Sequence, residues 1–485
     1  MVGSHTIRAS LADAENVPFW LDRSLRPEAQ PPLTGPATAD LAIVGGGYSG
    51  LWTALLAKQA DPALDVLIVE RGVCGGEASG RNGGFCASSL THGPANGSAR
   101  FPDEADTLVA LGQRNLDAIG ATIAELGIDC DWERTGELSV ATASWQLATL
   151  DDEVALAERF GQRIDVLDAE ATRAELNSPT YLGGVWHRDT TALLDPAKLA
   201  WGLRRACLDA GVRIAEHTEV TGLRADGAAL RLTTAAGPVR AGRVVLATNA
   251  FAPLLRRLRA YIAPVYDYAV VTEPLTTGQL DSLGWRNRQG LSDSANQFHY
   301  YRVTADNRIL WGGYDAIYHY GNRIRPDLER RPATFELLAG QFFETFPQLA
   351  GEVRFSHQWA GVIDTCSRFC AFFGSAYGGR LAYATGYTGL GVGATRFGAA
   401  VMLELLRAPG PHDWGPVIPG RALPGFGSLT SLRFVRSKPV PFPPEPARYL
   451  GIQATRWSLA RADARDGRRN LWLRTLDRLG LGFDS

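Results

Sequence analysis

The chain of 485 residues has little cysteine, few lysines and almost no net charge. Its formal charge of −2 provides no field that would attract nucleic acid or an anionic membrane. No run approaches the roughly 18 apolar residues of a membrane span, and residues 1–40 lack the basic start and apolar stretch of a secretory signal. We therefore expect a small-molecule partner, no nucleic acid, no membrane span and a location in the cytoplasm.

The six cysteines and eight histidines do not form a metal motif. Cys366 and Cys370 are the one close cysteine pair, and no second pair or neighbouring histidine completes a zinc site. The histidines show neither metal-ligand spacing nor the spacing of a catalytic triad. We predict no metal, and scattered cysteines in a large chain are typical of reduced thiols.

A glycine-rich turn between two apolar runs is the sharpest motif. Residues 39–44 and 65–70 are typical of buried strands, and residues 51–60 have helical composition. Between them Gly45, Gly47 and Gly50 form G-x-G-x-x-G, in which the glycines permit the turn, the approach of a pyrophosphate and close packing of helix on strand. A glycine-rich turn without a nucleotide is the alternative interpretation.

Glu70 strengthens the nucleotide interpretation. It stands twenty residues after Gly50, at the end of the second strand, where a carboxylate can accept hydrogen bonds from ribose hydroxyls. An acid at this position disfavours a 2′-phosphate. Residues 71–84 follow and are too rich in glycine for a helix or a strand, so they predict an extended backbone surface that suits a flat ring.

Residues 78–84, Ala-Ser-Gly-Arg-Asn-Gly-Gly, resemble the signature of the D-amino acid oxidase-like FAD-dependent oxidoreductases, in the branch of the γ-glutamylputrescine oxidases. Further segments match this family in order across residues 39–408: 192–199, 244–249, 300–302 with 308–313, and 386–392. The resemblance implies an α/β fold, in which a doubly wound, Rossmann-like FAD-binding domain is interleaved with an α+β substrate domain containing a large mixed antiparallel sheet.

The expected division of the chain follows from these matches. Residues 1–38 form a mostly irregular lead-in, and residues 39–100, 190–262 and 355–408 form the discontinuous FAD-binding domain. Residues 101–189 and 263–354 form the substrate domain. Residues 409–485 comprise a proline-rich linker and a helical tail, which we expect to pack on the body or to form a subunit interface in a homo-oligomer.

The last matching loop also makes physical sense by itself. Gly389 and Gly391 precede an apolar helix predicted over residues 394–406, so the helix amides and its positive dipole end can face an anion. In the family this loop faces the pyrimidine edge of the flavin, where reduction places negative charge. A loop that merely caps the helix is the alternative.

The resemblance implies a set of FAD-binding residues: Gly45, Gly47, Tyr48, Ser49, Gly50, Glu70, Arg71, Ala78, Ser79, Arg81, Asn82, Gly83, Gly84, Val220, Asn249, Thr388, Gly389, Leu390 and Gly391. By family position, the side chains implied for catalysis at the substrate pocket are Tyr266, Tyr301, Arg302 and Asp364. Arg302 could clamp a substrate carboxylate or pair with an acidic neighbour. Asp364 could attract an ammonium group or be an ordinary strand-end carboxylate satisfied by hydrogen bonds.

Two departures from the family limit what the resemblance implies. Sarcosine oxidases place a lysine near the flavin to activate oxygen, but no lysine occurs between Lys198 and Lys438, which puts fast oxidase activity in doubt. Those enzymes also tether the flavin through a cysteine before the last loop, and the offset of Cys366 and Cys370 does not clearly match. We therefore expect non-covalent FAD.

The expected function is oxidation of a C–N bond of a small amine or amino acid, with hydride transfer to flavin N5 and hydrolysis of the resulting imine. The electron acceptor is oxygen or another molecule. Two alternatives stay open: a flavin dehydrogenase acting on a C–OH or an opine-like substrate, and a flavin-holding subunit of a larger assembly.

Overall fold

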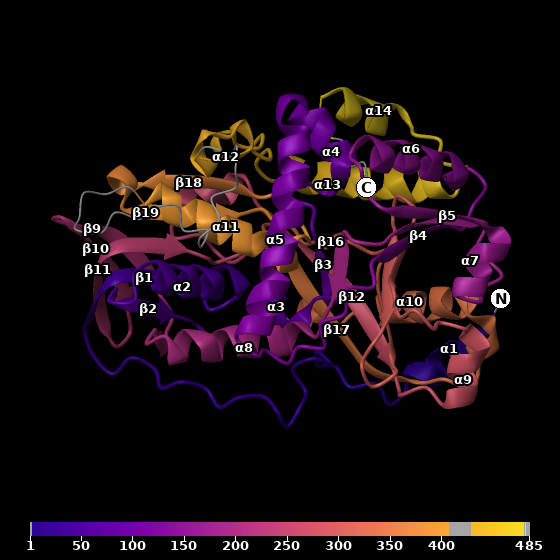
Figure 1. Cartoon of the computed structure of the whole chain (residues 1–485), viewed down its shortest axis with the longest axis horizontal. Coiled ribbons are helices and arrows are strands. Elements are labelled where there is room, and N and C mark those ends of the chain that lie inside the picture. The colour runs from indigo at the N-terminus through magenta and orange to yellow at the C-terminus, as the bar shows by residue number, and fades with distance from the viewer. Residues whose placement is uncertain (1, 407–427, 480, 482–485) are drawn as a thin grey trace.

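The computed structural model describes residues 2–406, 428–479 and 481. It contains an eight-stranded sheet, a nine-stranded sheet and a small two-stranded sheet. The two large sheets lie next to each other, with the eight-stranded one on the left of Figure 1. The predicted start of the proline-rich linker, at residue 409, lies outside the described residues.

The eight-stranded sheet has the order β18-β19-β11-β1-β2-β8, and β9 and β10 extend from β11 as an antiparallel meander. From β19 to β8 the strands run parallel, and the inner ones are buried on both faces. This confirms the predicted doubly wound α/β class. The bounds are β1 (Ala37–Val44), β2 (Val66–Val69), β8 (Arg213–Ala215), β9 (Gly222–Asp226), β10 (Ala229–Thr234), β11 (Gly237–Leu246), β18 (Phe372–Ala376) and β19 (Leu381–Thr385).

Helices from distant parts of the chain cover this sheet. Helix α2 (Tyr48–Ala60) packs between α8 (Pro196–Asp209) and α11 (Gly391–Leu405), and α5 (Ala105–Glu125) packs on α11. All residues of α2 from Tyr48 to Lys58 are buried. Because a helix that is apolar all round needs neighbours on every side, the composition of α2 explains its central place.

The nine-stranded sheet is mixed and has the order β16-β12-β15-β14-β13-β4-β6-β5, with β17 paired to β12. Its pairs are antiparallel except β13 with β4. The bounds are β4 (Glu137–Ala141), β5 (Ile164–Asp168), β6 (Gly183–His187), β12 (Ala263–Thr272), β13 (Gly290–Asp293), β14 (His299–Val303), β15 (Ile309–Gly313), β16 (Ile317–Tyr318) and β17 (Phe355–Thr365).

Strand β17 differs from the sequence-based division. Residues 355–365 were expected in the FAD-binding domain, but they pair with β12 along the whole length of that strand in the second sheet. The antiparallel register from Ala263↔Thr365 to Thr272↔Phe355 explains this placement, since it satisfies the backbone groups that the two strands turn toward each other. The rest of the predicted division stays a prediction.

The remaining elements connect or cover the sheets. Helix α10 (Pro332–Thr345) buries its phenylalanines against one face of the second sheet. The others are α1 (Ser4–Leu11), α3 (Ala78–Arg81), β3 (Phe85–Ala87), α4 (Gly93–Arg100), α6 (Gln146–Arg159), α7 (Ala169–Glu175), β7 (Thr191–Leu193), α9 (Thr277–Leu283), α12 (Arg433–Arg436), α13 (Ala447–Asp463) and α14 (Leu471–Arg478), with short 3₁₀ turns η1–η6 between them.

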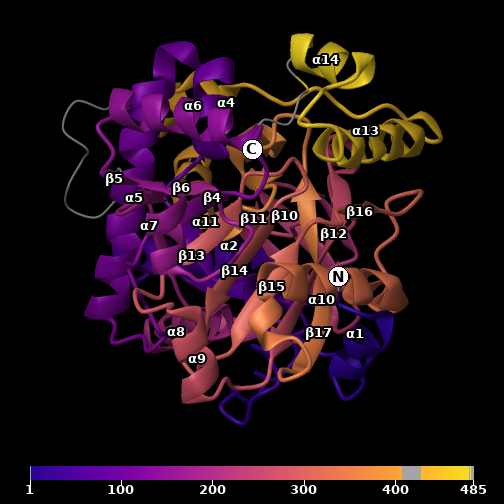
Figure 2. The same ribbon diagram turned by 90° about the vertical axis from the view of Figure 1, so that its right-hand side faces the viewer.

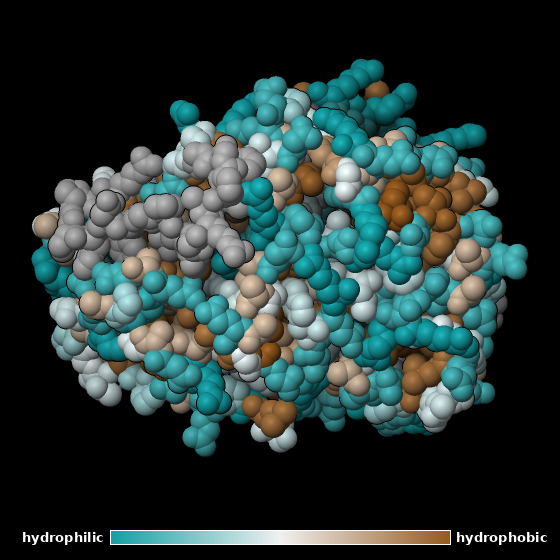
Figure 3. All heavy atoms as spheres, viewed as in Figure 1, coloured by the Kyte–Doolittle hydropathy of each residue, from teal (hydrophilic) through white to brown (hydrophobic). Residues whose placement is uncertain are grey.

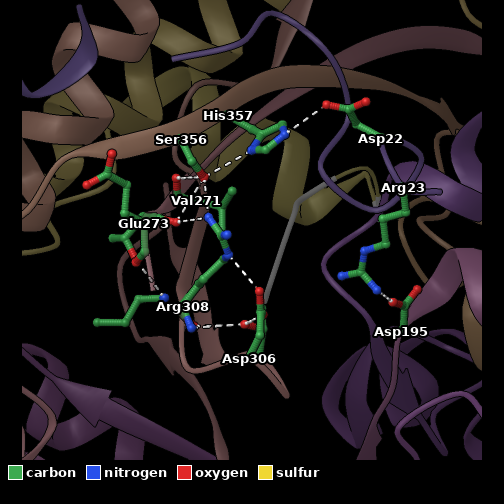
Figure 4. A network of polar contacts seen from close by, with 12 residues as sticks. Asp22, Arg23, Asp195, Val271, Glu273, Asp306, Arg308, Ser356 and His357 are labelled. Carbon is green, nitrogen blue, oxygen red and sulfur yellow. Dashed lines mark hydrogen bonds and ion pairs between the residues drawn. The ribbon is translucent and has the colours of Figure 1, made fainter. Parts of the chain in front are cut away.

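The N-terminal segment is more ordered than the irregular lead-in predicted from its sequence. Helix α1 packs on α10, and Phe19 and Trp20 are buried in a cluster with residues of β12, β15 and β17. Figure 4 shows polar contacts beyond this cluster: Asp22 Oδ2 lies 3.3 Å from Nε2 of His357 on β17, and Arg23 pairs with Asp195, the N-cap of α8. The segment therefore contacts elements of both halves of the molecule.

The C-terminal tail packs along the top of the molecule in Figure 1, and Figure 2 shows α13 and α14 from the side of the second sheet. No helix among the described residues is long and apolar enough to cross a membrane. The face in Figure 3 is mostly hydrophilic. Its largest hydrophobic areas lie over the half that carries the second sheet.

Candidate active site

A cavity of about 1030 Å³ lies between the two large sheets. Its walls come from the carboxyl ends of β1, β2 and β11, from β12, β14 and β17, and from the tail. Strand β1 lies between β2 and β11, so the strand order reverses at its carboxyl end, which is where open α/β sheets bind ligands. The volume is at the upper end of the roughly 300–1,000 Å³ usual for small-molecule sites.

The turn after β1 can be built only with glycine at two of its positions. Gly45 has φ of +109°, and a Cβ there would lie 2.4 Å from the carbonyl oxygen of Ala247, which follows the neighbouring strand β11. A Cβ at Gly50 would lie 2.0 Å from the carbonyl oxygen of Gly45. Gly47 is the N-cap of α2, and Gly47, Tyr48 and Ser49 line the cavity, so the amino end of that helix faces it and suits a phosphate.

Glu70 lines the same end of the cavity. Its carboxylate accepts hydrogen bonds from the backbone N–H groups of Gly46 and Gly72, both at 2.7 Å. Burial raises the pKa of Glu70, and these two hydrogen bonds oppose that rise. Each carboxylate oxygen keeps a second lone pair, which leaves acceptor capacity for the hydroxyls of a ribose.

Residues 78–84 form the floor beside the turn. Ser79 Oγ accepts from the N–H of Tyr48 at 2.9 Å, and the Asn82 side chain donates to the carbonyls of Ala78 and Ser79. The ring of Tyr300 packs against Gly83, where a Cβ would lie 2.5 Å from it. The prediction that residues 71–84 contain no helix is wrong for residues 78–81, which form α3, whereas the backbone that follows is bare at Gly83.

The last loop, residues 386–391, is held by Asp364. The Asp364 carboxylate accepts from the N–H groups of Gly386 at 2.5 Å and Tyr387 at 3.1 Å and from Oγ1 of Thr385 at 3.1 Å. Burial raises the pKa of Asp364 to about 6. Thr388 has a left-handed backbone conformation with φ of +51°, a strain that such hydrogen bonds can maintain. These three hydrogen bonds favour the interpretation of Asp364 as a strand-end carboxylate that is satisfied by its own surroundings.

The structure brings nearly all of the predicted FAD-binding residues to one cavity. Gly50 and Gly84 are the exceptions: Gly50 packs helix on strand, and Gly84 offers its carbonyl to Arg302. The predicted residues that line the cavity are Gly45, Gly47, Tyr48, Ser49, Glu70, Arg71, Ala78, Ser79, Arg81, Asn82, Gly83, Val220, Asn249, Thr388, Gly389, Leu390 and Gly391.

Three residues predicted around the substrate do not line the cavity. Arg302 is 1% exposed, and its guanidinium donates to the carbonyls of Leu194 and Gly84. Burial lowers the pKa of Arg302 to about 10. The Tyr301 hydroxyl bonds that of Tyr181, and Tyr266 donates to the carbonyl of Arg325. The carboxylate clamp predicted for Arg302 is therefore wrong in this arrangement, because backbone carbonyls occupy its donors.

Three other residues of the second sheet face the cavity instead, and two of them are direct neighbours of predicted residues. Asp267, between Tyr266 and Tyr268, accepts from the hydroxyl of Tyr300 at 2.6 Å, and both side chains line the cavity. Trp359 of β17 also lines it and donates Nε1–H to the carbonyl of Arg81 at 2.8 Å. Sequence reasoning missed these three. The alternation of the strands was the signal that could have found them.

The tail closes the remaining side of the cavity. Residues of α13 and α14 line it, including Ile452, Leu459 and Trp472. Asp463, at the end of α13, accepts from the backbone N–H groups of Asn296 and Gln297, and Arg456 pairs with Asp315. The tail is therefore anchored to the second sheet over the cavity, an arrangement with no counterpart among the predicted site residues.

The two cysteines considered for a flavin tether lie behind the last loop. Both are buried and are absent from the cavity wall among the described residues. Sγ of Cys366 points to the carbonyls of Cys370, at 3.2 Å, and Gly386, at 3.5 Å. Burial raises the pKa of both thiols, which disfavours the reactive thiolate.

Comparisons with known proteins agree with this geometry. Residues 40–405 match the family model described as FAD dependent oxidoreductase. A gamma-glutamylputrescine oxidoreductase of Escherichia coli (strain K12) is 34% identical over 384 residues, which cover 77% of this chain and 85% of that protein. The beta subunit of a sarcosine oxidase from Rhodobacter capsulatus is 24% identical over 67% of this chain and 74% of that protein.

Solved structures share the fold. Glycine oxidase from Geobacillus kaustophilus superposes with a TM-score of 0.64 at 21% identity, covering 79% of this chain and 98% of that one. L-proline dehydrogenase from P. horikoshii gives a TM-score of 0.63 at 20% identity, covering 77% and 94%. The glycine turn that no Cβ could enter, the acceptor capacity of Glu70 and the bare backbone at Gly83 fit an FAD molecule. The chain belongs to the FAD dependent oxidoreductase family.

Proposed function

We propose that the protein oxidises the C–N bond of a small amine, giving an imine that water then hydrolyses. The relatives named for γ-glutamylputrescine and sarcosine support a nitrogen-bearing substrate. The observation that carries the proposal is one continuous cavity, which runs from the glycine turn after β1 to the polar wall at Asp267 and Tyr300 on the second sheet. A dinucleotide and an amine can meet in such a cavity.

The nucleotide end would be held by the backbone amides at Gly47, with Glu70 as acceptor for ribose hydroxyls. Residues 78–83 and the last loop would hold the flavin ring, non-covalently. When bound, FAD supplies the hydride acceptor. The amino end of α11, which begins at Gly391 and follows Gly389, would supply donors for negative charge at the edge of the ring.

The chain's own residues orient the substrate and exclude water. Trp359 and Phe298 give the cavity apolar walls on the side of the second sheet, and Leu459 closes it from the tail. A dry site strengthens the electrostatic interactions that hold a charged substrate. It also keeps the carbon that loses the hydride in a fixed position.

Location and association of the protein follow from its cysteines and its tail. We place the protein in the cytoplasm, which its six buried, unpaired cysteines support. Association through the tail also stays a prediction. Trp457 of α13 is 60% exposed, so the outer side of this helix offers apolar surface while its inner side lines the cavity.

The test is an anaerobic titration of the purified protein with polyamines, N-methyl amines, amino acids and simple alcohols. We expect a yellow protein whose flavin absorbance bleaches with amines. Colourless protein that gains no absorbance with added FAD, or bleaching by alcohols alone, would contradict the proposal. Readmission of oxygen then identifies the acceptor, since rapid return of colour indicates an oxidase.

A further inference from the structure

We propose that Asp267 and Tyr300 form the site that recognises the substrate amine: the Asp267 carboxylate binds the ammonium group, and the Tyr300 hydroxyl positions that carboxylate. The substrate class is an amine that carries no carboxylate on the reacting carbon. The inference rests on the proposed function and deepens it.

The position of the pair is the first argument. Asp267 lies in the middle of β12 and is paired across the strands with Gly361 of β17, which has no side chain to cover it. A Cβ added at Gly361 would lie 3.8 Å from Cβ of Arg81, so the face of the sheet that carries Asp267 adjoins the segment proposed to hold the flavin ring. The carboxylate therefore lies next to the place where a C–N bond must react.

Tyr300 is rigidly placed. Its ring lies against Gly83 and Gly312, where an added Cβ would come within 2.5 Å of ring atoms at both positions. It also packs edge-on against Phe85, with ring centroids 5.8 Å apart. Because the ring is wedged in place, its hydroxyl fixes the Asp267 carboxylate at 2.6 Å. The backbone N–H of Tyr268 also donates to this carboxylate, whose remaining lone pairs can accept from a ligand.

Charge is the second argument. Within the described part of the chain Asp267 makes no ion pair, although it is held in a poorly solvated wall. Burial raises its pKa to about 6, which the hydrogen bond from Tyr300 opposes. A desolvated carboxylate without a cationic partner attracts a cation from solution, and the ammonium group of an amine supplies one.

Of the other carboxylates that line the cavity, Glu219 follows β8 of the eight-stranded sheet, and Glu77 pairs with Arg71 and Arg81. Glu137 accepts from the hydroxyls of Ser292 and Thr191, and Asp364 holds the last loop. Glu70 belongs to the nucleotide end. Among these carboxylates, Asp267 alone combines a place on the second sheet with free acceptor capacity.

The arginines of the wall explain why the substrate lacks a carboxylate at the reacting carbon. Arg81 pairs with Glu329 at 2.8 Å, and Arg456 pairs with Asp315. Arg448 donates to Asn322 Oδ1 at 2.8 Å, and Arg71 lies over the ring of Phe251. Each guanidinium that lines the cavity in the described residues thus has a partner, and those of Arg71, Arg81 and Arg456 are next to carboxylates, which disfavours their use as a clamp for an α-carboxylate.

The test uses the FAD-loaded protein and three ligands of one shape. tert-Butylamine cannot be oxidised because its carbon beside nitrogen carries no hydrogen; tert-butanol is its neutral analogue and pivalate its anionic one. Binding is measured at pH 8 from the change in flavin absorbance and by calorimetry. We expect wild type to bind tert-butylamine at least 10-fold more tightly than either analogue.

Three variants test whether the preference for tert-butylamine depends on Asp267. Asp267→Asn should weaken tert-butylamine binding about 10-fold or more, as expected for loss of a charged hydrogen bond, and leave tert-butanol binding within 3-fold. Tyr300→Phe should weaken amine binding by a smaller factor, about 2- to 5-fold. Glu137→Gln, which removes a satisfied carboxylate from the same cavity, is the matched control and should leave the amine preference in place.

The outcomes separate this inference from the proposed function. A wild-type protein that binds pivalate as tightly as tert-butylamine, or an Asp267→Asn variant that binds both as wild type does, overturns amine recognition at Asp267. The proposed function still stands if amines bleach that protein. A colourless protein, or one that no amine reduces, overturns the proposed function itself. Comparison of the wild type with its three ligands decides the inference even if a variant fails to fold.

Discussion

Two carboxylates of the cavity, Asp267 and Asp364, have the same raised pKa of about 6 and different partners. Burial is the first cause in both cases. Asp364 accepts from three donors of the last loop and the strand before it, whereas Asp267 accepts from the Tyr300 hydroxyl and the Tyr268 backbone and also faces the cavity. Equal pKa values therefore accompany different roles, and the partners decide which carboxylate can bind a ligand.

We expect amine binding to depend on pH through the ionisation of Asp267. An ammonium ligand needs the ionised carboxylate, so binding of tert-butylamine should fall as pH decreases through about 6. The neighbouring groups are Tyr300 on β14 and, across Gly361, Arg81 with its partners Glu77 and Glu329. Tyr300→Phe removes a donor that favours the ionised form, so the midpoint should shift upward. A midpoint unchanged in Tyr300→Phe would contradict this.

The hydrogen bonds of Asp364 to the last loop should affect the affinity for FAD. Asp364→Asn replaces an acceptor oxygen by an NH₂ group that faces backbone donors of the last loop, Gly386 or Tyr387. Loss of hydrogen bonds to a charged group costs about 1.5–3 kcal/mol, so FAD should bind roughly 10- to 100-fold more weakly. Fluorescence of released FAD measures this. Thr385→Val, which removes a single donor, should have a smaller effect.

At the scale of elements, the sequence predicted strands well and their faces poorly. The strands expected over residues 39–44 and 65–70 form β1 and β2. In β12, however, the predicted Tyr266 lies on the face under α10, and its neighbour Asp267 lies on the face of the cavity. The same one-residue difference separates Tyr301 from Tyr300 on β14. Both faces of the sheet are covered, so both carry aromatic residues, and composition cannot tell which one faces the ligand.

We expect helix α13 to limit the length of the amine that the cavity accepts. Leu459 lines the cavity from this helix, so Leu459→Trp should shorten the space and Leu459→Ala should lengthen it. A few methylene groups in an apolar pocket change discrimination by about 10-fold or more. We expect the ratio of kcat/KM for long over short amines to fall in the first variant and rise in the second. Trp457→Ala, on the exposed side of the same helix, should leave the ratio unchanged.

At the scale of the molecule, the cavity is assembled from segments that are distant in sequence. The glycine turn and the signature at residues 78–84 were predictable because backbone geometry limits them to particular residue types. The closure by the tail was not, because Leu459 and Trp472 follow an ordinary helical pattern that gives no sign of the surface they cover. Position in space, rather than residue type, gives these side chains their place in the site.

The N-terminal segment contacts both halves of the molecule, and Trp20 is its central contact. The side chain is 1% exposed, packs with Ala269 and Trp359 of the second sheet, and donates Nε1–H to the carbonyl of Asn82 at 2.9 Å. Trp20→Ala should lower the free energy of unfolding by about 3–5 kcal/mol. Because Asn82 belongs to the proposed flavin-binding surface, FAD should also dissociate at least 10-fold more readily.

Trp20→Phe separates packing from hydrogen bonding. It keeps most of the buried ring and loses the donor to Asn82, so stability should fall by only about 1 kcal/mol. If the N-terminal segment supports the flavin surface, the FAD dissociation constant should rise in both variants, measured by fluorescence below the unfolding transition. Normal FAD affinity in a destabilised Trp20→Ala protein would show that Trp20 stabilises the second sheet alone, because the signature would then keep its shape without the indole beneath Asn82.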